Sequence, residues 1–203
     1  MRIIKDYNKE LSNKIAKCMN EAGSDKHSDH NYSHAYSHFI SMLPSTDNIN
    51  FLEIGIANVE PDKSSLHGWS NIFETGNIYG VDINPEKMIN TDRIKTFVID
   101  QGSLIDLSRF RESTNYVKFD IILDDGSHSF SDALTSFQYL INSLKDTGIY
   151  MIEDIGKNDG VYGQSVVQWV NYLQTVPNID WDVINCKPDK SNDDSVIIGV
   201  WKI

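Results

Sequence analysis

The chain has 203 residues, of which 40% are hydrophobic, and its formal net charge is -11 at pH 7. This length and this hydrophobic content suit one globular domain with a substantial core and exclude a disordered chain. The acidic charge argues against general binding to nucleic-acid phosphates or anionic membranes, because both would repel the protein. Cys18 and Cys186 are too few for a disulfide framework or a zinc site, so they favour a reducing compartment.

The sequence shows no targeting or membrane-spanning segment. Its first residues, MRIIKDYNKELSNK, become polar too early for a signal peptide. No apolar run approaches the ~18 residues that a membrane-spanning helix needs. We therefore expect a soluble, cytoplasmic protein without nucleic-acid or membrane partners, and we leave open whether it forms a homo-oligomer.

Short apolar runs alternate with helical patterns along the chain. Runs that are typical of strands buried on both faces cover residues 50–56, 78–83, 95–99, 119–124 and 148–153. Between Phe130 and Leu144, apolar residues recur at three- and four-residue steps, which predicts an amphipathic helix with Gly148 as its stop. Further helices are expected at 64–73 and 163–174. The tail segments 180–186 and 195–203 are separated by a polar turn, so we expect them to pair as antiparallel strands.

This alternation predicts an α/β fold with a doubly wound, mainly parallel seven-stranded sheet, helices on both faces and an antiparallel C-terminal strand. Repeats and linkers are absent from the sequence, so we expect a single domain over residues 1–203. Residues 1–45, rich in His and Tyr, would form an N-terminal helical cap, and residues 46–203 would form the core. Trp69 and Trp169 are expected to pack inside this core.

Acidic or amide side chains close each of the five buried strands. In a doubly wound sheet, ligands bind beyond the carboxyl ends of the strands. An aspartate at one strand end says little, because strand ends lead into solvated loops, but five such ends at one rim favour a binding site. The residues are, in chain order, Glu53 with Gly55, Asp82, Asp100 with Gln101, Asp124 with Asp125, and Glu153 with Asp154.

The ordered motifs FLEIGIA, YGVDINPEK, FVIDQGS, FDIILDDGSH and GIYMIEDI resemble those of the class I S-adenosylmethionine-dependent methyltransferases. More narrowly, DDGSH followed by an amphipathic helix and IED is similar to the metal-dependent sugar O-methyltransferases of macrolide and polysaccharide pathways. The segment GSDKHSDHNYSHAY is similar to a GTDK…HGY…Y segment in that group. The resemblance covers residues 23–155. It implies a Rossmann-like methyltransferase fold and methyl transfer from S-adenosylmethionine to a hydroxyl of a sugar or glycoside.

The resemblance also implies roles toward S-adenosylmethionine. Gly55 would let the backbone approach the methionine end closely, and Glu53 would reach its ammonium group directly or through water. Asp82 would accept hydrogen bonds from the ribose hydroxyls. Asp100 and Gln101 would lie near the adenine.

One loop departs from the family pattern. GIANVEPDKSS keeps only Gly55 where the family carries two or three glycines, and it contains Pro61. Asn58 and Ser65 therefore receive no assignment.

A hydroxyl barely ionises near neutral pH, so methylating one calls for a divalent cation that lowers the hydroxyl pKa and a base that accepts the proton. Carboxylates suit a hard ion such as Mg²⁺. Asp125 would bind this ion together with Glu153 and Asp154 from an adjacent strand end. His128, three residues after Asp125, would be the general base. Asp124 would contact the cofactor, ligate the metal or orient the loop.

Several alternatives stay open. A metal-dependent O-methyltransferase of a catechol or another small phenol would use the same metal geometry. A non-catalytic cofactor-binding relative is the other alternative, since the first loop is poor in glycine. A Rossmann enzyme that binds NAD or a nucleotide sugar is disfavoured, because the G-x-G-x-x-G turn is missing.

The segment before the first strand and the loop after the fifth receive weaker predictions. The N-terminal histidines lack acids or cysteines at ligand spacing, which favours exposed surface positions or contacts within the cap over a metal site; they are His27, His30, His34 and His38. The resemblance implies that some residues of this segment close over cofactor or substrate, namely Asp25, Lys26, His30 and Tyr32. Residues 156–165 contain three glycines and are predicted to form a mobile lid or an acceptor-binding loop.

Overall fold

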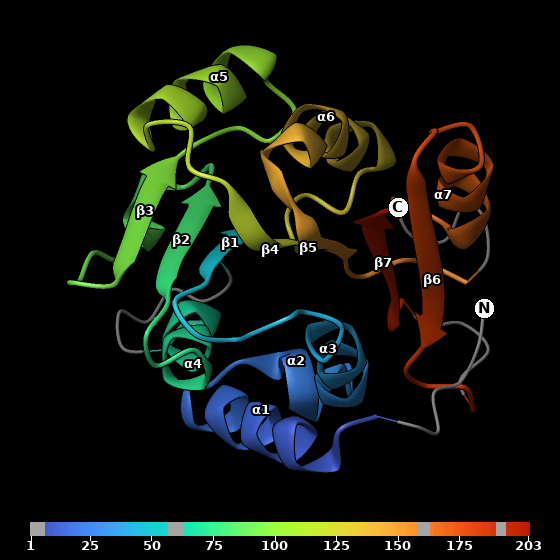
Figure 1. Cartoon of the computed structure of the whole chain (residues 1–203), viewed down its shortest axis with the longest axis horizontal. Helices are drawn as coiled ribbons and strands as arrows, with labels where there is room; N and C mark the ends of the chain where they lie inside the picture. Colours follow the sequence, from blue (N-terminus) through green and yellow to red (C-terminus); the bar gives the residue numbers. More distant parts are fainter. Residues whose placement is uncertain (1–6, 57–62, 158–162, 190–193) are drawn as a thin grey trace.

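The computed structural model describes residues 7–56, 63–157, 163–189 and 194–203. In these residues, one seven-stranded sheet runs through the molecule with helices on both faces (Figure 1). The strand order is β3-β2-β1-β4-β5-β7-β6. The strands are β1 (Asn50–Ile54), β2 (Asn77–Asp82), β3 (Ile94–Val98), β4 (Phe119–Asp124), β5 (Leu144–Ile152), β6 (Ile179–Asn185) and β7 (Val196–Lys202).

The sheet topology places a ligand site at its centre. Strands β1 to β5 pair in parallel, whereas β7 lies antiparallel between β5 and β6. This arrangement confirms the predicted Rossmann-like methyltransferase fold with its antiparallel C-terminal pairing. The strand order reverses between β1 and β4, and in such sheets ligands bind beyond the carboxyl ends at this switch point.

The helices divide between the two faces of the sheet (Figure 1). One face packs against α5 (Leu104–Ser113), α6 (Phe130–Leu140) and α7 (Val166–Leu173) around a core that contains Trp169. On the other face, α3 (Ser33–Ile40) and α4 (Ser65–Ile72) lie nearer the sheet, and α1 (Lys9–Glu21) and α2 (Asp25–Ser28) pack outside or beside them, around a core that contains Trp69. Both tryptophans are fully buried, as predicted. The division into a cap of residues 1–45 and a core of residues 46–203 stays a prediction.

Local sequence explains where several helices begin. Ser64, Ser103 and Ser165 each accept a hydrogen bond from a backbone N–H in the first turn of α4, α5 and α7 respectively. Such caps satisfy donors that a helix leaves unpaired at its start. None of the described helices is long and apolar enough to cross a membrane.

Two features of the fold differ from the sequence prediction. Helix α6 ends at Leu140, and a 3-10 turn (Ile141–Ser143) leads directly into β5, so Gly148 lies inside that strand rather than at a helix stop. Leu144 packs in the same core as α6, so apolar spacing alone could not separate the helix from the strand. Helix α5 is absent from the prediction, because its first turn exposes Leu104 and Ile105 and thereby blurs the apolar pattern.

Candidate active site

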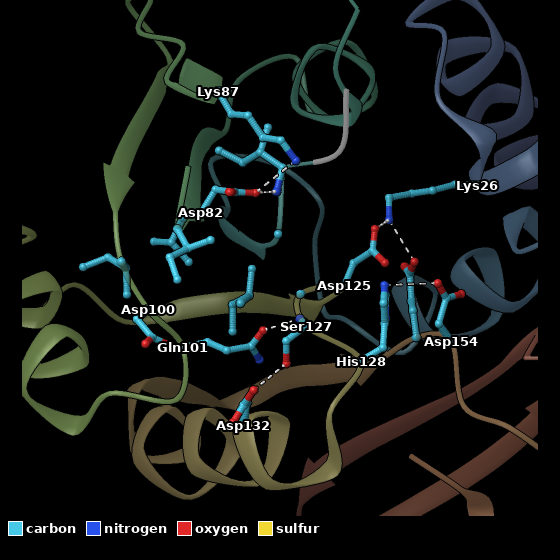
Figure 2. A pocket seen from close by; sticks show the side chains of 18 of the residues that line it. Lys26, Asp82, Lys87, Asp100, Gln101, Asp125, Ser127, His128, Asp132 and Asp154 are labelled. Atoms are coloured by element: carbon cyan, nitrogen blue, oxygen red, sulfur yellow. Dashed lines mark hydrogen bonds and ion pairs between the residues drawn. The ribbon is translucent and has the colours of Figure 1, made fainter. Parts of the chain in front are cut away.

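A cavity of about 530 Å³ opens beyond the carboxyl ends of the central strands. Pockets of this size suit small organic ligands. Figure 2 shows that residues from the strand ends and from α2 surround it. Most residues predicted for the site line this cavity, namely Gly55, Asp82, Asp100, Gln101, Asp125, His128, Glu153 and Asp154. Glu53 and Asp124 are not part of its wall.

Gly55 brings the loops that follow β1 and β4 into direct contact. Its φ is +88°, and an added Cβ would lie 2.0 Å from the carbonyl oxygen of Asp125. The backbone N–H of Asp125 in turn donates to the carbonyl of Ile54 at 2.8 Å. Only glycine fits this position, so Gly55 determines where the Asp125 backbone lies. The rest of this loop, residues 57–62 with Asn58 and Pro61, lies outside the described residues.

Asp82 presents a carboxylate that is held in place by backbone groups. Its Oδ2 accepts the N–H of Ile56 at 2.7 Å, and its Oδ1 accepts the N–H of Asn84 at 2.8 Å. The Nζ of Lys87 lies 3.6 Å from Oδ2. Each carboxylate oxygen retains a second lone pair for a ligand. Asp82 is therefore preorganised to accept hydrogen bonds, and its contact with a ribose stays a prediction.

Gln101 connects the loop after β3 to the loop after β4. Its Nε2 donates to Asp124 Oδ1 at 3.0 Å, and its Oε1 accepts the N–H of Ser127 at 2.7 Å. Asp124 also accepts a 2.7 Å hydrogen bond from Ser136 Oγ. Burial raises the pKa of Asp124, although the hydrogen bonds from Ser136 and Gln101 oppose the rise. This arrangement favours a role for Asp124 in orienting the loop, and its contact with the cofactor stays a prediction.

Asp125, His128 and Asp154 meet at one end of the cavity. Each offers one ligand atom, and these atoms lie within 4.8 Å of one another. The Nε2 of His128 is 3.6 Å from Asp154 Oδ2, and its buried Nδ1 has no hydrogen-bond partner among the described residues. His128 and Asp154 both adopt positive φ, 54° and 51°, which is uncommon for residues other than glycine. Two carboxylates and an imidazole at this separation could hold a divalent cation.

Glu153 makes different contacts. Its Oε2 accepts a 2.8 Å hydrogen bond from the Nζ of Lys26, and its Oε1 accepts one from the hydroxyl of Tyr36. Burial raises the pKa of Glu153 well above its ordinary value, although Lys26 opposes the rise. Glu153 is not in the group of three potential ligands described above, and its role as a metal ligand stays a prediction.

Lys26 reaches Asp125 from one side of the cavity (Figure 2). Its Nζ is 2.5 Å from Asp125 Oδ2 and 3.3 Å from Glu53 Oε1, besides its contact with Glu153. Glu53 is fully buried behind Lys26, where it also accepts a 2.7 Å hydrogen bond from Ser65 Oγ. Burial alone would lower the pKa of Lys26, but the three carboxylates raise it well above its ordinary value. The ammonium is therefore charged.

The segment between α2 and α3 forms another side of the site. The hydroxyl of Tyr32 donates to Asp154 Oδ1 at 2.7 Å. The Nδ1 of His30 lies 3.3 Å from the same oxygen and 3.9 Å from Asp194 Oδ1, which forms a second group of potential metal ligands. Spacing along the chain did not reveal these acidic partners of His30, and the preference for a role other than metal binding stays a prediction. Folding brings these partners from the far end of the chain.

Sequence reasoning missed several residues of the site. Ser127, Lys87 and Asp132 line the cavity but occupy no strand-end position. Tyr36 falls at the last tyrosine of the GSDKHSDHNYSHAY segment, so that motif could have identified it. The predicted lid at 156–165 includes residues 158–162, which lie outside the described residues.

No protein-family model matches the chain. It is 36% identical over 115 residues to demethylmacrocin O-methyltransferase from Streptomyces fradiae, a match that covers 54% of this chain and 28% of the relative. It is also 36% identical over 110 residues to mycinamicin VI 2''-O-methyltransferase from Micromonospora griseorubida, with 53% and 27% covered. The chain thus spans little more than a quarter of the length of these relatives.

Solved structures agree with the sequence matches. The MycE methyltransferase of the mycinamycin pathway, solved in complex with Mg, SAH and mycinamycin VI, has a TM-score of 0.72 to this chain at 25% identity. The alignment covers 93% of this chain and 54% of MycE. This chain resembles the sugar O-methyltransferases. The resemblance predicted from the motifs is thus confirmed.

The described residues of this chain fit both a methyl donor and a divalent cation. A backbone cradle at Gly55, which any Cβ would fill, lies in the same cavity as the preorganised carboxylate of Asp82. At the other end, Asp125 and Asp154 supply oxygen ligands beside the imidazole of His128. The donor set is hard and acidic, which suits Mg²⁺.

Proposed function

We propose that this chain transfers a methyl group from S-adenosylmethionine to a hydroxyl of a sugar or glycoside with the assistance of a divalent cation such as Mg²⁺. The observation that carries this proposal is the meeting of Asp125, His128 and Asp154 in the cavity that also contains Gly55 and Asp82. Potential cation ligands, a base and a donor pocket in one cavity are what transfer to a weakly acidic hydroxyl requires. The named activities of the relatives support a sugar as acceptor.

Each residue has a defined task in this reaction. Gly55 and Asp82 hold the methyl donor, and Asp125 and Asp154 hold the cation, which lowers the pKa of the acceptor hydroxyl when bound. The Nε2 of His128 accepts the hydroxyl proton while the acceptor oxygen attacks the methyl carbon. The carbon–sulfur bond breaks, the sulfur keeps the electron pair, and SAH is the product.

Neighbouring groups support these tasks. The hydroxyl of Tyr32 donates to Oδ1 of Asp154, so Oδ2 stays directed toward His128. Burial and the neighbouring Asp125 raise the pKa of Asp154, although His30, Tyr32 and His128 oppose the rise. A bound cation would add a further opposing charge and favour the ionised carboxylate.

A methyl-transfer assay tests the proposal. The protein is incubated with S-adenosylmethionine, Mg²⁺ and a panel of free sugars, nucleotide sugars, glycosides and catechols, and SAH is quantified by mass spectrometry. Asp125→Asn should lower the rate, with partial recovery at higher Mg²⁺. His128→Ala should slow transfer by roughly 10²–10⁴-fold while SAH and cation binding stay near normal. His67→Ala on α4, outside the cavity wall, is the matched control and should keep the wild-type rate.

Different results would refute different elements of the proposed reaction. A methyl-transfer rate that a chelator leaves unchanged would show that the reaction does not use a divalent cation. Wild-type turnover of His128→Ala across the pH range would place the base elsewhere. Methylation of catechols without any sugar would favour the phenol alternative, and a folded protein that binds neither S-adenosylmethionine nor SAH would favour the non-catalytic one.

A further inference from the structure

We propose that Gly163 and Gln164 are positioning residues that hold His128, the base of the proposed reaction, in place. Gly163 contacts the backbone of His128, and Gln164 anchors Gly163 to the end of β5 and to α7. Neither residue lines the cavity, so both act through His128. This inference rests on the proposed function, because it concerns how the base of that reaction is oriented.

The imidazole of His128 lacks the hydrogen bond that usually orients a catalytic histidine. Such a histidine is commonly held by a hydrogen bond to its second ring nitrogen, which fixes the ring and its tautomer. The Nδ1 of His128 is buried and has no such partner among the described residues. The backbone of His128 therefore has to set where the ring lies. Its φ of 54° is a conformation that persists only where surrounding contacts hold it.

Gly163 supplies such a contact. A Cβ added at Gly163 would lie 2.3 Å from the carbonyl oxygen and 3.1 Å from the carbonyl carbon of His128, so the two backbones pack directly against each other. The carbonyl of Gly163 also accepts the N–H of Phe130, the first residue of α6, at 3.0 Å. The N-cap residue Ser129 forms no side-chain cap hydrogen bond, so Gly163 satisfies a donor at the start of α6 in its place. Gly163 thus holds the chain at His128 and just after it.

Gln164 prevents Gly163 from moving away. Its side chain is buried, its Nε2 donates to the carbonyl of Glu153 at 2.7 Å, and its Oε1 accepts the indole N–H of Trp169 at 2.8 Å. These hydrogen bonds join the neighbour of Gly163 to the end of β5 and to α7. A side chain added at Gly163 would therefore displace the backbone of His128 rather than the segment that contains Gly163.

Gly163→Ala should lower kcat while leaving donor binding intact. Moving a catalytic group by about 1 Å can cost about 10²-fold in rate, so kcat should fall by about 10–10²-fold. The KM for S-adenosylmethionine and the SAH affinity should stay within about two-fold of the wild-type values. Gly148→Ala is the matched control, because its Cβ would also meet a backbone atom, the carbonyl oxygen of Asp120 at 2.9 Å, but outside the cavity wall. It should lower Tm and keep the wild-type kcat.

The His128→Ala background separates positioning of the base from general damage to the fold. With the imidazole removed, Gly163→Ala should change kcat by less than about two-fold, because the clash then displaces no base. Damage to the fold would instead lower kcat equally in both backgrounds. If Gly163→Ala does not fold, Gln164→Leu takes its place, since it removes both side-chain hydrogen bonds of Gln164. It should lower kcat only when His128 is present.

Histidine NMR provides a readout that needs no acceptor. In protein labelled with carbon-13 histidine, the ring signal of His128 is the one that is missing from His128→Ala. This signal should shift in Gly163→Ala, whereas the signal of His67 on α4 should not. Gly148→Ala should shift neither.

These results distinguish failure of the inference from failure of the proposed function. A wild type that methylates no acceptor and binds neither S-adenosylmethionine nor SAH would refute the proposed function and this inference with it. An active wild type whose kcat is matched by Gly163→Ala would overturn the inference alone. A loss of equal size in the His128→Ala background, or an unmoved His128 signal, would overturn it as well.

Discussion

Gly55→Ala tests whether the contact between the first and fourth strand loops sets the geometry of the site. The residue has φ +88°, and an alanine forced into this region costs about 1–2 kcal/mol. The added Cβ would also lie 2.0 Å from the oxygen and 2.6 Å from the carbonyl carbon of Asp125. These are backbone atoms that cannot rotate away, and such overpacking costs about another 1–3 kcal/mol. The expected loss of stability is therefore about 2–5 kcal/mol.

Gly23→Ala is the matched control, because Gly23 also has positive φ, +70°, but its Cβ would meet only the flexible side chain of Lys63. It should cost about 1–2 kcal/mol. For a chain of this size, each kcal/mol shifts Tm by about 2–4 °C, so calorimetry should show losses of roughly 4–20 °C for Gly55→Ala and 2–8 °C for the control. Because Gly55→Ala displaces Asp125, it should also weaken Mn²⁺ binding, whereas the control should not. Equal Tm values and equal Mn²⁺ affinities for the two variants would refute this reasoning.

Three further predictions address the donor pocket and the scaffold. Asp82→Asn should weaken SAH binding, measured by calorimetry, by about 1.5–3 kcal/mol, which is the usual contribution of hydrogen bonds to a charged group. An unchanged SAH affinity would show that Asp82 does not contact the methyl donor. Burial lowers the pKa of His34 below its ordinary 6.5, so the folded chain binds fewer protons than the unfolded chain. The neutral His34 side chain therefore stabilises the fold above pH 6.5, and this stabilisation is lost as pH falls toward the lowered pKa of His34. The Tm of His34→Gln should fall less than the Tm of the wild type between about pH 7 and about pH 5, and equal decreases in Tm would contradict this. Arg93→Met removes hydrogen bonds to Ser70, Phe73 and Gly76 at the end of α4, and urea unfolding should show a loss of about 2–3 kcal/mol, with a loss below about 0.5 kcal/mol as the contrary result.

The central strands were predictable because they are buried on both faces and appear as continuous apolar runs, whereas the edge strand β3 exposes Lys95 and Val98 and is not buried on both faces as predicted. The run predicted at 119–124 is β4, and those at 50–56 and 95–99 differ from β1 and β3 by one or two residues. The helices were harder to predict. Helix α5 exposes apolar residues in its first turn, and the boundary between α6 and β5 lies within one continuous apolar pattern.

The site shows where strand-end reasoning succeeds and where it fails. Residues just beyond a strand, such as Gly55 and Asp125, reach the cavity. Glu53 and Asp124, still inside their strands, follow the alternation of the pleat and point under the helices, whereas Asp82, at the end of β2, lines the cavity. Glu53 therefore contacts Ser65 on the α4 face, whereas Asp124 contacts Ser136 on the α6 face. Spacing along the chain cannot predict these directions.

Long-range contacts were equally out of reach. Lys26 meets Glu153 although 127 positions separate them, and no local pattern encodes that pairing. The motif that contains Lys26 indicated closure over a ligand, but only the fold shows that the ammonium lies among the acids.

The central claim is that a methyl donor and a divalent cation share this cavity. A crystal structure of the chain soaked with SAH and Mn²⁺, with the anomalous signal of manganese recorded, tests it most directly. We predict SAH over Gly55 with its ribose at Asp82, and one manganese peak beside Asp125 and Asp154. Full occupancy of SAH without a manganese peak at these carboxylates, or SAH bound away from Gly55 and Asp82, would contradict the claim.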